Sequence, residues 1–406
     1  MGRKTRVSRN GTLFYRQASL VTYKLGWEDP GKMNEETVSV KEKFVMTVLG
    51  ARPQFIKAAP VSLALKRAGI QERLVHTGQH YDREMSGVFF DSLGLDEPFA
   101  DLGVGSASHG SQTGRMLEKL EELMLQWKPS FVLVYGDTNS TLAGALAAAK
   151  LSIPIAHVEA GLRSFNRKMP EEINRVLTDH VSDVLFVPTD AAVDNLYREG
   201  ITRNVVRTGD VMYDAACRFE PHFQRVAGPF LRELGVDGVP YAALTVHRAE
   251  NTDDSERWNA IIEGIRRVVD GGMPVVWPIH PRVRGRIQSE NLPGVKVTEP
   301  LPYFEMQALV SRAKVVLTDS GGLQKEAAFH GVPCVTLRDE TEWVELVDAE
   351  VNHLAGTNPT LIESLALGAI WPSVGLPDGL YGDGNSSKLI AETLIEIENS
   401  LGNRDE

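Results

Sequence analysis

The segment TDSGGLQKE, Thr318–Glu326, joins two stretches of different pattern. The apolar run Val315–Leu317 before it is typical of a buried strand, and the residues after it have a helical pattern. Ser320, Gly321 and Gly322 therefore fall in a turn at the start of a helix. Backbone N–H groups at such a point, with the helix dipole, bind phosphates and other anions. We expect an anion-binding turn here.

Glu326 lies about one turn into the same helix. A carboxylate at that distance can accept hydrogen bonds from a ribose diol, so the segment favours a nucleotide over a simple phosphate. The alternative is an ordinary strand-to-helix turn, in which Asp319 or Ser320 only caps the helix.

Three more strand ends in the same half of the chain carry polar side chains. His247 follows the run YAALTV, His280 follows PVVWPI, and Arg338 follows CVTL. Ends of neighbouring parallel strands meet at one edge of a sheet. Together with the serine and glycines they form a donor-rich set, as a diphosphate requires.

Carboxylates follow strands in the other half. Asp137 comes after FVLVY, Glu159 comes after IPIAHV, and Glu171 begins the next helix. Asp137 suits a general base and is also a typical helix cap. Glu159 needs a partner if it is buried, and Arg163 is one candidate. Glu171 in a first turn after proline is a common helix start.

The first strand, FVMTVLG, ends in a turn that carries Arg52 and Lys57. This turn lacks the G-x-G-x-x-G dinucleotide fingerprint. Both cations are candidates for an anionic ligand, although solvated surface charge explains Lys57 nearly as well. His80 and His109 also lie near strand ends and are weaker candidates. The segment from His109 to Gly114 is expected to precede a helix that runs from Arg115 to Gln126.

Short β-rich runs alternate with amphipathic helical stretches from Phe44 onward, which predicts an α/β fold with parallel sheets and helices on both faces. We expect one Rossmann-like domain over 44–210 and a second over 211–384. Residues 1–43 read as a leader that is disordered or not native, with Met33 as an alternative start.

The composition excludes several classes of function. A chain of 406 residues with 42% hydrophobic content is globular, and its net charge of −11 argues against a nucleic-acid or anionic-membrane partner. The two cysteines, Cys217 and Cys334, form no metal-binding or disulfide pattern and fit a reducing, cytoplasmic compartment. No apolar run is long enough to span a bilayer.

The motifs in order resemble the non-hydrolysing UDP-N-acetylglucosamine 2-epimerases. The matching segments are GARPQFIK, VYGDTNST, HVEAGLRS, MPEEINR, HRAEN, PIHPR, TDSGGLQKEA, LRDETEW and YGDG. They cover nearly everything from Phe44 to the C-terminus. The resemblance implies two Rossmann-like domains in the glycosyltransferase-B arrangement with the ligand in the interdomain cleft. It also implies a helix over 385–403 that packs back on the first domain.

The resemblance also implies roles for single residues. UDP and its sugar would be bound by Arg52, Lys57, His247, His280, Ser320, Gly321, Gly322, Glu326 and Arg338. Asp137, Glu159 and Glu171 would do the acid–base work, with His247 beside them. The family uses no cofactor and no metal, and it is usually homodimeric. Its reaction is an anti elimination of UDP to a glycal, followed by re-addition on the opposite face.

Three departures from the UDP-N-acetylglucosamine enzymes favour a particular branch. The chain has Gln79-His80-Tyr81-Asp82 in the loop that helps to form an activator site in bacterial members. The sequence therefore leaves open whether this chain has such a site. It has TEWVE where they have TERPE, and a shorter segment before Pro170. These versions look like the branch that acts on UDP-2,3-diacetamido-2,3-dideoxyglucuronate, whose sugar carboxylate would need a cation. Arg167 and Lys168 are candidates, and solvated loop charge is the alternative.

Other functions fit the same residues. A hydrolysing epimerase would release UDP and free sugar, and a glycosyltransferase of the same architecture would require an acceptor. A nucleotide-sugar-binding protein without chemistry would be unaffected by Asp137→Asn.

Overall fold

The computed structural model describes residues 43–79, 87–288, 290–368 and 376–402. The expected leader up to residue 42, with Met33, lies outside these residues, and so does the expected activator-loop segment from His80 to Asp82. The described residues form two compact units. The first contains the residues up to Val158, Ile173–Leu185 and the chain from Ala391, and the second contains Glu159–Glu172 and Phe186–Ile390.

The first sheet has the strand order β3-β2-β1-β4-β5-β6-β7, and β1 to β5 pair in parallel. Its strands are β1 (Val45–Leu49), β2 (Glu72–His76), β3 (Ala100–Asp101), β4 (Phe131–Tyr135), β5 (Ile155–Val158), β6 (Val184–Val187) and β7 (Val205–Arg207). The apolar runs of β1, β4, β5 and β6 are buried along their whole length. Strands buried on both faces are typical of parallel sheets between helices.

The helices that accompany this sheet are α1 (Arg52–Arg67), α2 (Gly87–Leu93), α3 (His109–Trp127), α4 (Asn139–Lys150), α5 (Pro170–Val181) and α6 (Asp190–Arg198). α3 begins six residues before Arg115, where the sequence pattern predicted it. The physical reason is Gln112, whose buried amide donates to the backbone oxygens of Gln79 at 3.1 Å and Gly105 at 2.9 Å. These contacts hold a glycine-containing first turn that helix propensity alone disfavours.

The second sheet has six parallel strands in the order β10-β9-β8-β11-β12-β13. They are β8 (Ala242–Thr245), β9 (Val275–Pro278), β10 (Val295–Thr298), β11 (Val315–Thr318), β12 (Cys334–Thr336) and β13 (Asn352–Leu354). The remaining helices are α7 (Val211–Leu234), α8 (Ala249–Thr252), α9 (Ser255–Asp270), η1 (Pro281–Val283), α10 (Arg284–Ile287), α11 (Tyr303–Ser311), α12 (Gly321–Phe329), α13 (Val344–Asp348), α14 (Pro359–Leu367) and α15 (Ser386–Gly402).

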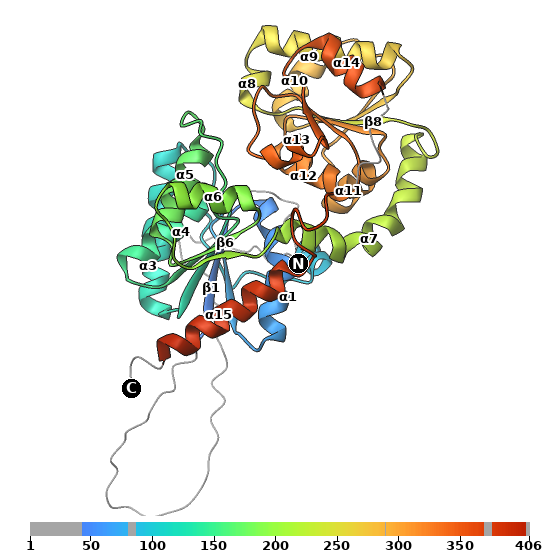
Figure 1. The fold of residues 1–406 in the computed structure, drawn as a ribbon. Coiled ribbons are helices and arrows are strands. Elements are labelled where there is room, and N and C mark those ends of the chain that lie inside the picture. Colours follow the sequence, from blue (N-terminus) through green and yellow to red (C-terminus); the bar gives the residue numbers. More distant parts are fainter. Residues whose placement is uncertain (1–42, 80–86, 289, 369–375, 403–406) are drawn as a thin grey trace, which may run out of the picture. The chain divides into compact units, whose positions relative to one another are not determined.

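Helices cover both faces of the second sheet. α9 and α14 lie side by side on one face (Figure 1), where Trp258, Ile262 and Ile362 pack against the strands. α7, α11 and α12 contribute Leu231, Leu309 and Ala327 to the core on the other face. The α/β class with two Rossmann-like domains is confirmed.

In both sheets the order in which successive strands are added reverses at one point. In the first, β1 lies beside β4, and in the second, β8 lies beside β11. Parallel sheets bind ligands outside the carboxyl ends of their strands at such a switch point, because the connecting helices diverge to opposite faces there. The fold therefore singles out the turns after β1 and β4 in one sheet and after β8 and β11 in the other.

Candidate active site

The carboxylate of Asp319 ties the turn after β11 to the turn after β8. It is fully buried and accepts hydrogen bonds from the backbone N–H groups of His247 at 3.0 Å and Arg248 at 2.9 Å. The side chain of Asn251 donates to it at 3.1 Å. Because Asp319 is held by the neighbouring turn, it is a cross-strand acceptor and not the simple helix cap that the sequence left open.

The N-terminus of α12 carries the predicted anion-binding turn. Ser320 is the residue before the first turn, and its side chain makes no capping hydrogen bond. A Cβ atom at Gly321 would lie 2.2 Å from Oε1 of Glu342, so the chain needs glycine there. A Cβ atom at Gly322 would meet no heavy atom within 4 Å. The first turn of α12 is therefore packed on one side and open on the other, where a phosphate group would approach.

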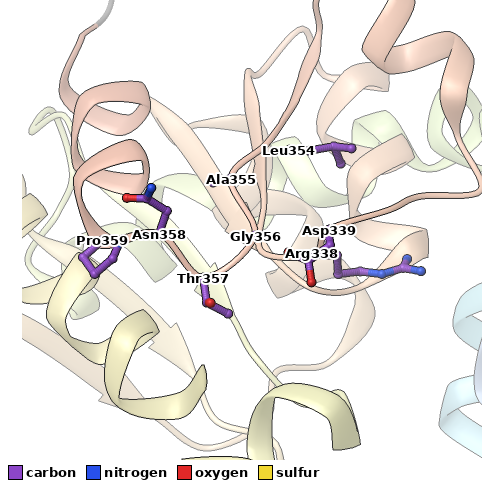
Figure 2. Close-up of a pocket in the computed structure, with 8 residues that line it drawn as sticks. All are labelled: Arg338, Asp339, Leu354, Ala355, Gly356, Thr357, Asn358 and Pro359. Carbon is purple, nitrogen blue, oxygen red and sulfur yellow. The ribbon is translucent and has the colours of Figure 1, made fainter. Parts of the chain in front are cut away.

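Arg338 lies in the loop after β12, and its side chain is 2% exposed. One guanidinium nitrogen donates to Glu342 at 2.8 Å. The buried Nε atom makes no hydrogen bond among the described residues and lies 3.7 Å from the Glu250 carboxylate. Figure 2 shows the side chain pointing away from Asn358. Arg338 and the loop after β13 line a cavity of about 580 Å³. A buried donor that makes no hydrogen bond is costly, and this one has an ion-pair partner only at 3.7 Å, so its position suits an acceptor atom of an anionic ligand.

Glu342 lies between the two arginines of this region. Its carboxylate is 3.8 Å from Arg248 and 2.8 Å from Arg338. Burial alone raises the pKa of a carboxyl, but the two arginines hold the pKa of Glu342 below its ordinary value. Part of the positive charge at this strand end is thus neutralised within the protein.

His247 follows β8 and His280 follows β9, so both add polar side chains to the strand ends of the second sheet. Their ring centroids are 5.4 Å apart, and the His247 ring lies 3.3 Å from the Asp319 carboxylate. Burial lowers the pKa of His247, and Arg248 and Arg282 act in the same direction while Asp319 opposes them. At neutral pH His247 is therefore an uncharged hydrogen-bonding group. His280 is exposed, and its Nδ1 accepts from the backbone of Arg282 at 3.2 Å.

Glu326 is half-buried on α12. Burial raises the pKa of Tyr303 on α11, and the nearby Glu326 carboxylate adds to that effect. The Tyr303 hydroxyl is buried and has no hydrogen-bond partner among the described residues. The Glu326 carboxylate, about one turn from the start of α12, can accept hydrogen bonds from a diol.

Glu159 follows β5 and is almost buried, with 7% of its side chain exposed. Its carboxylate accepts from Lys325 at 2.8 Å, and Lys325 also pairs with Asp210. Arg163, the partner expected from the sequence, donates to Glu199 at 2.7 and 2.8 Å. A lysine on α12 replaces the arginine because the chain folds back by more than 160 residues, a separation that no local pattern signals.

Glu171 and Glu172 begin α5 in different environments. Glu171 is exposed, whereas Glu172 is buried and accepts hydrogen bonds from Ser164 and the Phe165 backbone at 2.9 Å. Glu172 therefore fixes the loop before the helix. Glu171 is left facing solvent.

Asp137 follows β4 in the first unit and pairs with Arg175 on α5. Arg175 is 5% exposed and Asp137 is 30% exposed, so the carboxylate faces solvent from a buried partner. Asn174 donates to the backbone oxygen of Asp137 at 2.9 Å and to Asn139 at 3.1 Å. Thr138 caps α4, accepting from the Thr141 backbone at 3.2 Å. Asp137 is thus held by an arginine and is not the cap.

Arg52 and Lys57 lie on α1, both half-buried. The position of this helix is fixed by Gln54, which donates to the backbone oxygen of Tyr135 at 2.8 Å and accepts from the Gly50 backbone at 2.8 Å. These contacts join the turn after β1 to the end of β4. The structure therefore places Arg52 and Asp137 on adjoining strand ends. His109 is near the same edge, with its ring 3.1 Å from the Asn139 amide.

Four residues of the site gave no usable signal in the sequence: Arg175, Asp210, Lys325 and Glu342. Each is a charged residue inside a helix, at its first residue or in a loop, where solvated charge is the common explanation. Only their burial, between 1% and 7% of the side chain exposed, distinguishes them.

Among the described residues there is no group of three or more His, Cys, Asp or Glu side chains placed to hold a metal ion. In that same part of the chain, every helix is too short or too polar to cross a membrane.

The chain matches the family model described as UDP-N-acetylglucosamine 2-epimerase over residues 63–395. Its curated relatives include a UDP-2,3-diacetamido-2,3-dideoxy-D-glucuronate 2-epimerase of Pseudomonas aeruginosa. The two are 50% identical over 358 residues, which is 87% of this chain and 99% of the relative.

Solved structures agree over the same length. The UDP-GlcNAc 2-epimerase of Methanocaldococcus jannaschii, in complex with UDP-GlcNAc and UDP, is 41% identical with a TM-score of 0.78, covering 87% of this chain and 99% of that one. The enzyme of Neisseria meningitidis bound to UDP-GlcNAc is 32% identical with a TM-score of 0.77 and the same coverage. The resemblance read from the motifs is confirmed. This chain is a member of the UDP-N-acetylglucosamine 2-epimerase family and so an isomerase of nucleotide sugars.

Proposed function

We propose that this enzyme epimerises C2 of UDP-2,3-diacetamido-2,3-dideoxyglucuronate, without hydrolysis of the product. The observation that carries the nucleotide part is the open first turn of α12 at the switch point of the second sheet, where a Cβ atom at Gly322 would meet no heavy atom within 4 Å. The choice of sugar is supported by the 50% identity to the Pseudomonas aeruginosa enzyme of that name. UDP-GlcNAc is the second candidate, because the 41% identical archaeal structure holds it.

The diphosphate would be bound by Ser320, Gly321 and Gly322 with Arg338 beside them. Arg52, Lys57, His247 and His280 would donate to the phosphate or sugar. The Glu326 carboxylate would accept hydrogen bonds from the ribose hydroxyls. Charge develops on the diphosphate as it leaves, so preorganised donors at a helix N-terminus stabilise the transition state more than the ground state.

The acid–base groups would be Asp137, Glu159 and Glu171. One carboxylate takes the proton from C2 while the C1–oxygen bond to the diphosphate breaks, which leaves UDP and a 1,2-unsaturated glycal. UDP then adds back to C1 as a second acid delivers a proton to the other face of C2. Acid–base catalysis of this kind contributes about 10²–10⁴-fold. Arg167 and Lys168, exposed in the loop before α5, would be the cations for the sugar carboxylate.

The homodimeric state and the cytoplasmic location expected from the sequence belong to this proposal as well. Sedimentation of the purified full chain tests the first: a mass of two chains supports it and a mass of one chain contradicts it. Fractionation of the native cells tests the second.

The deciding experiment is incubation with each of the two UDP-sugars in deuterated water. We expect a C2 epimer that still carries UDP and holds one deuterium at C2, with faster turnover of the uronate. Release of free sugar and UDP would instead indicate a hydrolysing enzyme. Turnover only with an added acceptor would indicate a glycosyltransferase. Binding without exchange would leave a protein that recognises the nucleotide sugar without chemistry.

A further inference from the structure

We propose that Lys325 is a positioning residue for the reaction, which holds the Glu159 carboxylate at a fixed place beside the anion-binding end of α12. The inference rests on the proposed function, because that function gives Glu159 its acid–base role.

The contacts of Lys325 are made by two carboxylates. Its ammonium donates to Glu159 at 2.8 Å and pairs with Asp210. The three side chains are 2%, 7% and 1% exposed. Although burial alone lowers the pKa of a lysine, Asp210 and Glu159 raise the pKa of Lys325 above its ordinary value. The ammonium is thus a permanent charge, fully engaged within the protein and unsuited to bind the substrate directly.

Asp210 anchors this cluster. One of its oxygens accepts from the backbone of Met212 at 2.7 Å as the cap of α7, and the other pairs with Lys325. Its own N–H donates to the backbone oxygen of Tyr381 at 2.9 Å. Because both the carboxylate and the backbone N–H of Asp210 are held by hydrogen bonds, Asp210 leaves the Lys325 ammonium little freedom to move.

Glu159 differs from Asp210 because its backbone is held in an unusual conformation. Its φ angle is +73°, in the left-handed region that favours glycine, and its N–H donates to the Phe186 backbone at 3.1 Å. A residue with a side chain persists there only when its surroundings fix it, and such residues cluster at functional sites. The conformation brings the carboxylate to Lys325 and not to the nearby Arg163.

Helix α12 carries both the open anion-binding turn and Lys325. Gly322, which leaves the first turn of α12 open, and Lys325 lie within one turn of each other. The Trp343 ring covers the ammonium, with its centroid 4.0 Å from Nζ. A shift of α12 on anion binding would therefore move the carboxylate that Lys325 holds.

The charges of this cluster allow an experiment to distinguish two roles of Lys325: positioning the Glu159 carboxylate, or only neutralising the buried carboxylates. Lys325 contributes one positive charge against the negative charges of Glu159 and Asp210, so the trio has a net charge of −1. Glu345 faces the same cluster; burial raises the pKa of its carboxyl, and the Tyr381 hydroxyl donates to it at 2.9 Å. Lys325→Met leaves two facing carboxylates. Lys325→Met with Asp210→Asn restores the net charge of the trio but removes the Lys325 contact to Glu159.

The test compares wild type, Lys325→Met, Asp210→Asn and the double variant, with Lys314→Met, an exposed lysine, as the matched control. The readouts are kcat and deuterium at C2, the Kd for UDP, and the midpoint of thermal unfolding. We expect the double variant to recover thermal stability that Lys325→Met loses. We expect its kcat to remain at least about 100-fold below that of Asp210→Asn, with the Kd for UDP changed less than about threefold. Lys314→Met should match wild type.

A double variant with a kcat equal to that of Asp210→Asn would overturn the inference, because Lys325 would then only neutralise Asp210. A loss of UDP affinity that accounts for the whole decrease in kcat/KM would overturn it as well. If Lys325→Met alone does not fold, the double variant still gives the decision. Absence of deuterium exchange in the wild type would contradict the proposed function, and with it the inference that rests on that function. A double variant that matches Asp210→Asn while the wild type exchanges deuterium would overturn the inference alone.

Discussion

The two strand-end regions of this protein have the same topology and different chemistry. Beside β1 and β4, most contacts are made by neutral groups: the Gln54 amide donates to Thr141 at 3.0 Å, and Ser140 donates to the Gln79 amide at 2.7 Å. Beside β8 and β11, the contacts are made by charges, with the buried Asp319 at their centre.

The difference follows from what each region has to do. In the first region the neutral network surrounds one ion pair, in which the buried Arg175 holds Asp137 and leaves that carboxylate 30% exposed. Under the proposed function this exposed carboxylate would be available for proton transfer. A network of buried carboxylates fixes backbone and side-chain donors against each other, so that they point toward a ligand that carries negative charge. Under the proposed function, the same sheet architecture would supply an acid–base group in the first region and anion donors in the second.

The largest effect that would test this contrast is expected from Asp319→Ala. It leaves the N–H groups of His247 and Arg248 buried without their acceptor, at about 1–3 kcal/mol for each group. We expect the free energy of unfolding to fall by about 3 kcal/mol or more. Chemical denaturation measures it. Asp254→Ala is the control, since it removes an exposed helix cap worth about 1 kcal/mol. Equal losses would show that Asp319 is only a cap.

Asp137→Asn tests the first region. We expect kcat to fall by about 10²–10⁴-fold, because an amide cannot accept the proton. The Kd for UDP should change little, since the diphosphate is assigned to other residues. Initial rates and calorimetric titration measure the two quantities. Asp190→Asn is the control, because it breaks an exposed pair with Arg207. A variant that keeps half of its activity would remove Asp137 from the mechanism.

The buried histidines sharpen the contrast in a smaller way. His157 in the first unit bonds to Asp179 at 2.7 Å, whereas His330 in the second donates to the neutral amide of Gln307 at 2.8 Å. Burial lowers the pKa of His330 to about 4. Below the unfolded value of about 6.5 the unfolded chain binds a proton that the folded chain excludes.

The stability contributed by an uncharged His330 is therefore complete above about pH 6.5 and decreases as the pH falls toward the folded pKa, by at most about 3 kcal/mol. We expect His330→Asn to flatten the decrease of the unfolding free energy over that range. Chemical denaturation at several pH values measures it, with the exposed His180→Asn as the matched control. Parallel curves for wild type and His330→Asn would contradict the assignment.

The smallest effect is expected from Gly322→Ala. The added methyl meets no protein atom within 4 Å, so stability should be unchanged or slightly higher, given the helix preference of alanine. The same methyl would occupy the open side of the first turn, and we expect UDP to bind about tenfold more weakly. Gly321→Ala is the comparison, because its methyl would lie 2.2 Å from Glu342 and should destabilise the fold itself. Unchanged UDP affinity in Gly322→Ala would place the diphosphate elsewhere.

Much of the site could be predicted because its signals are local. Ser320, Gly321 and Gly322 lie between an apolar run and a helical pattern, and His247, His280 and Arg338 follow apolar runs in the same way. The predicted roles of these residues, and of Asp137, Glu159 and Glu171, remain predictions. The start of α3 was wrong by six residues, because the Gln112 side chain is held by Gln79 and Gly105, and those contacts outweigh the low helix propensity of the glycines.

The sequence by itself determined the alternation of strands and helices, the polar strand ends and the motifs that mark the family. These depend on residue types a few positions apart, where periodicity and turn chemistry act. Only the tertiary structure decided which charges meet: Lys325 with Glu159 and Asp210, and Arg175 with Asp137. Such pairs join residues far apart in the chain, and whether a charge is buried and paired or simply solvated depends on the packing around it.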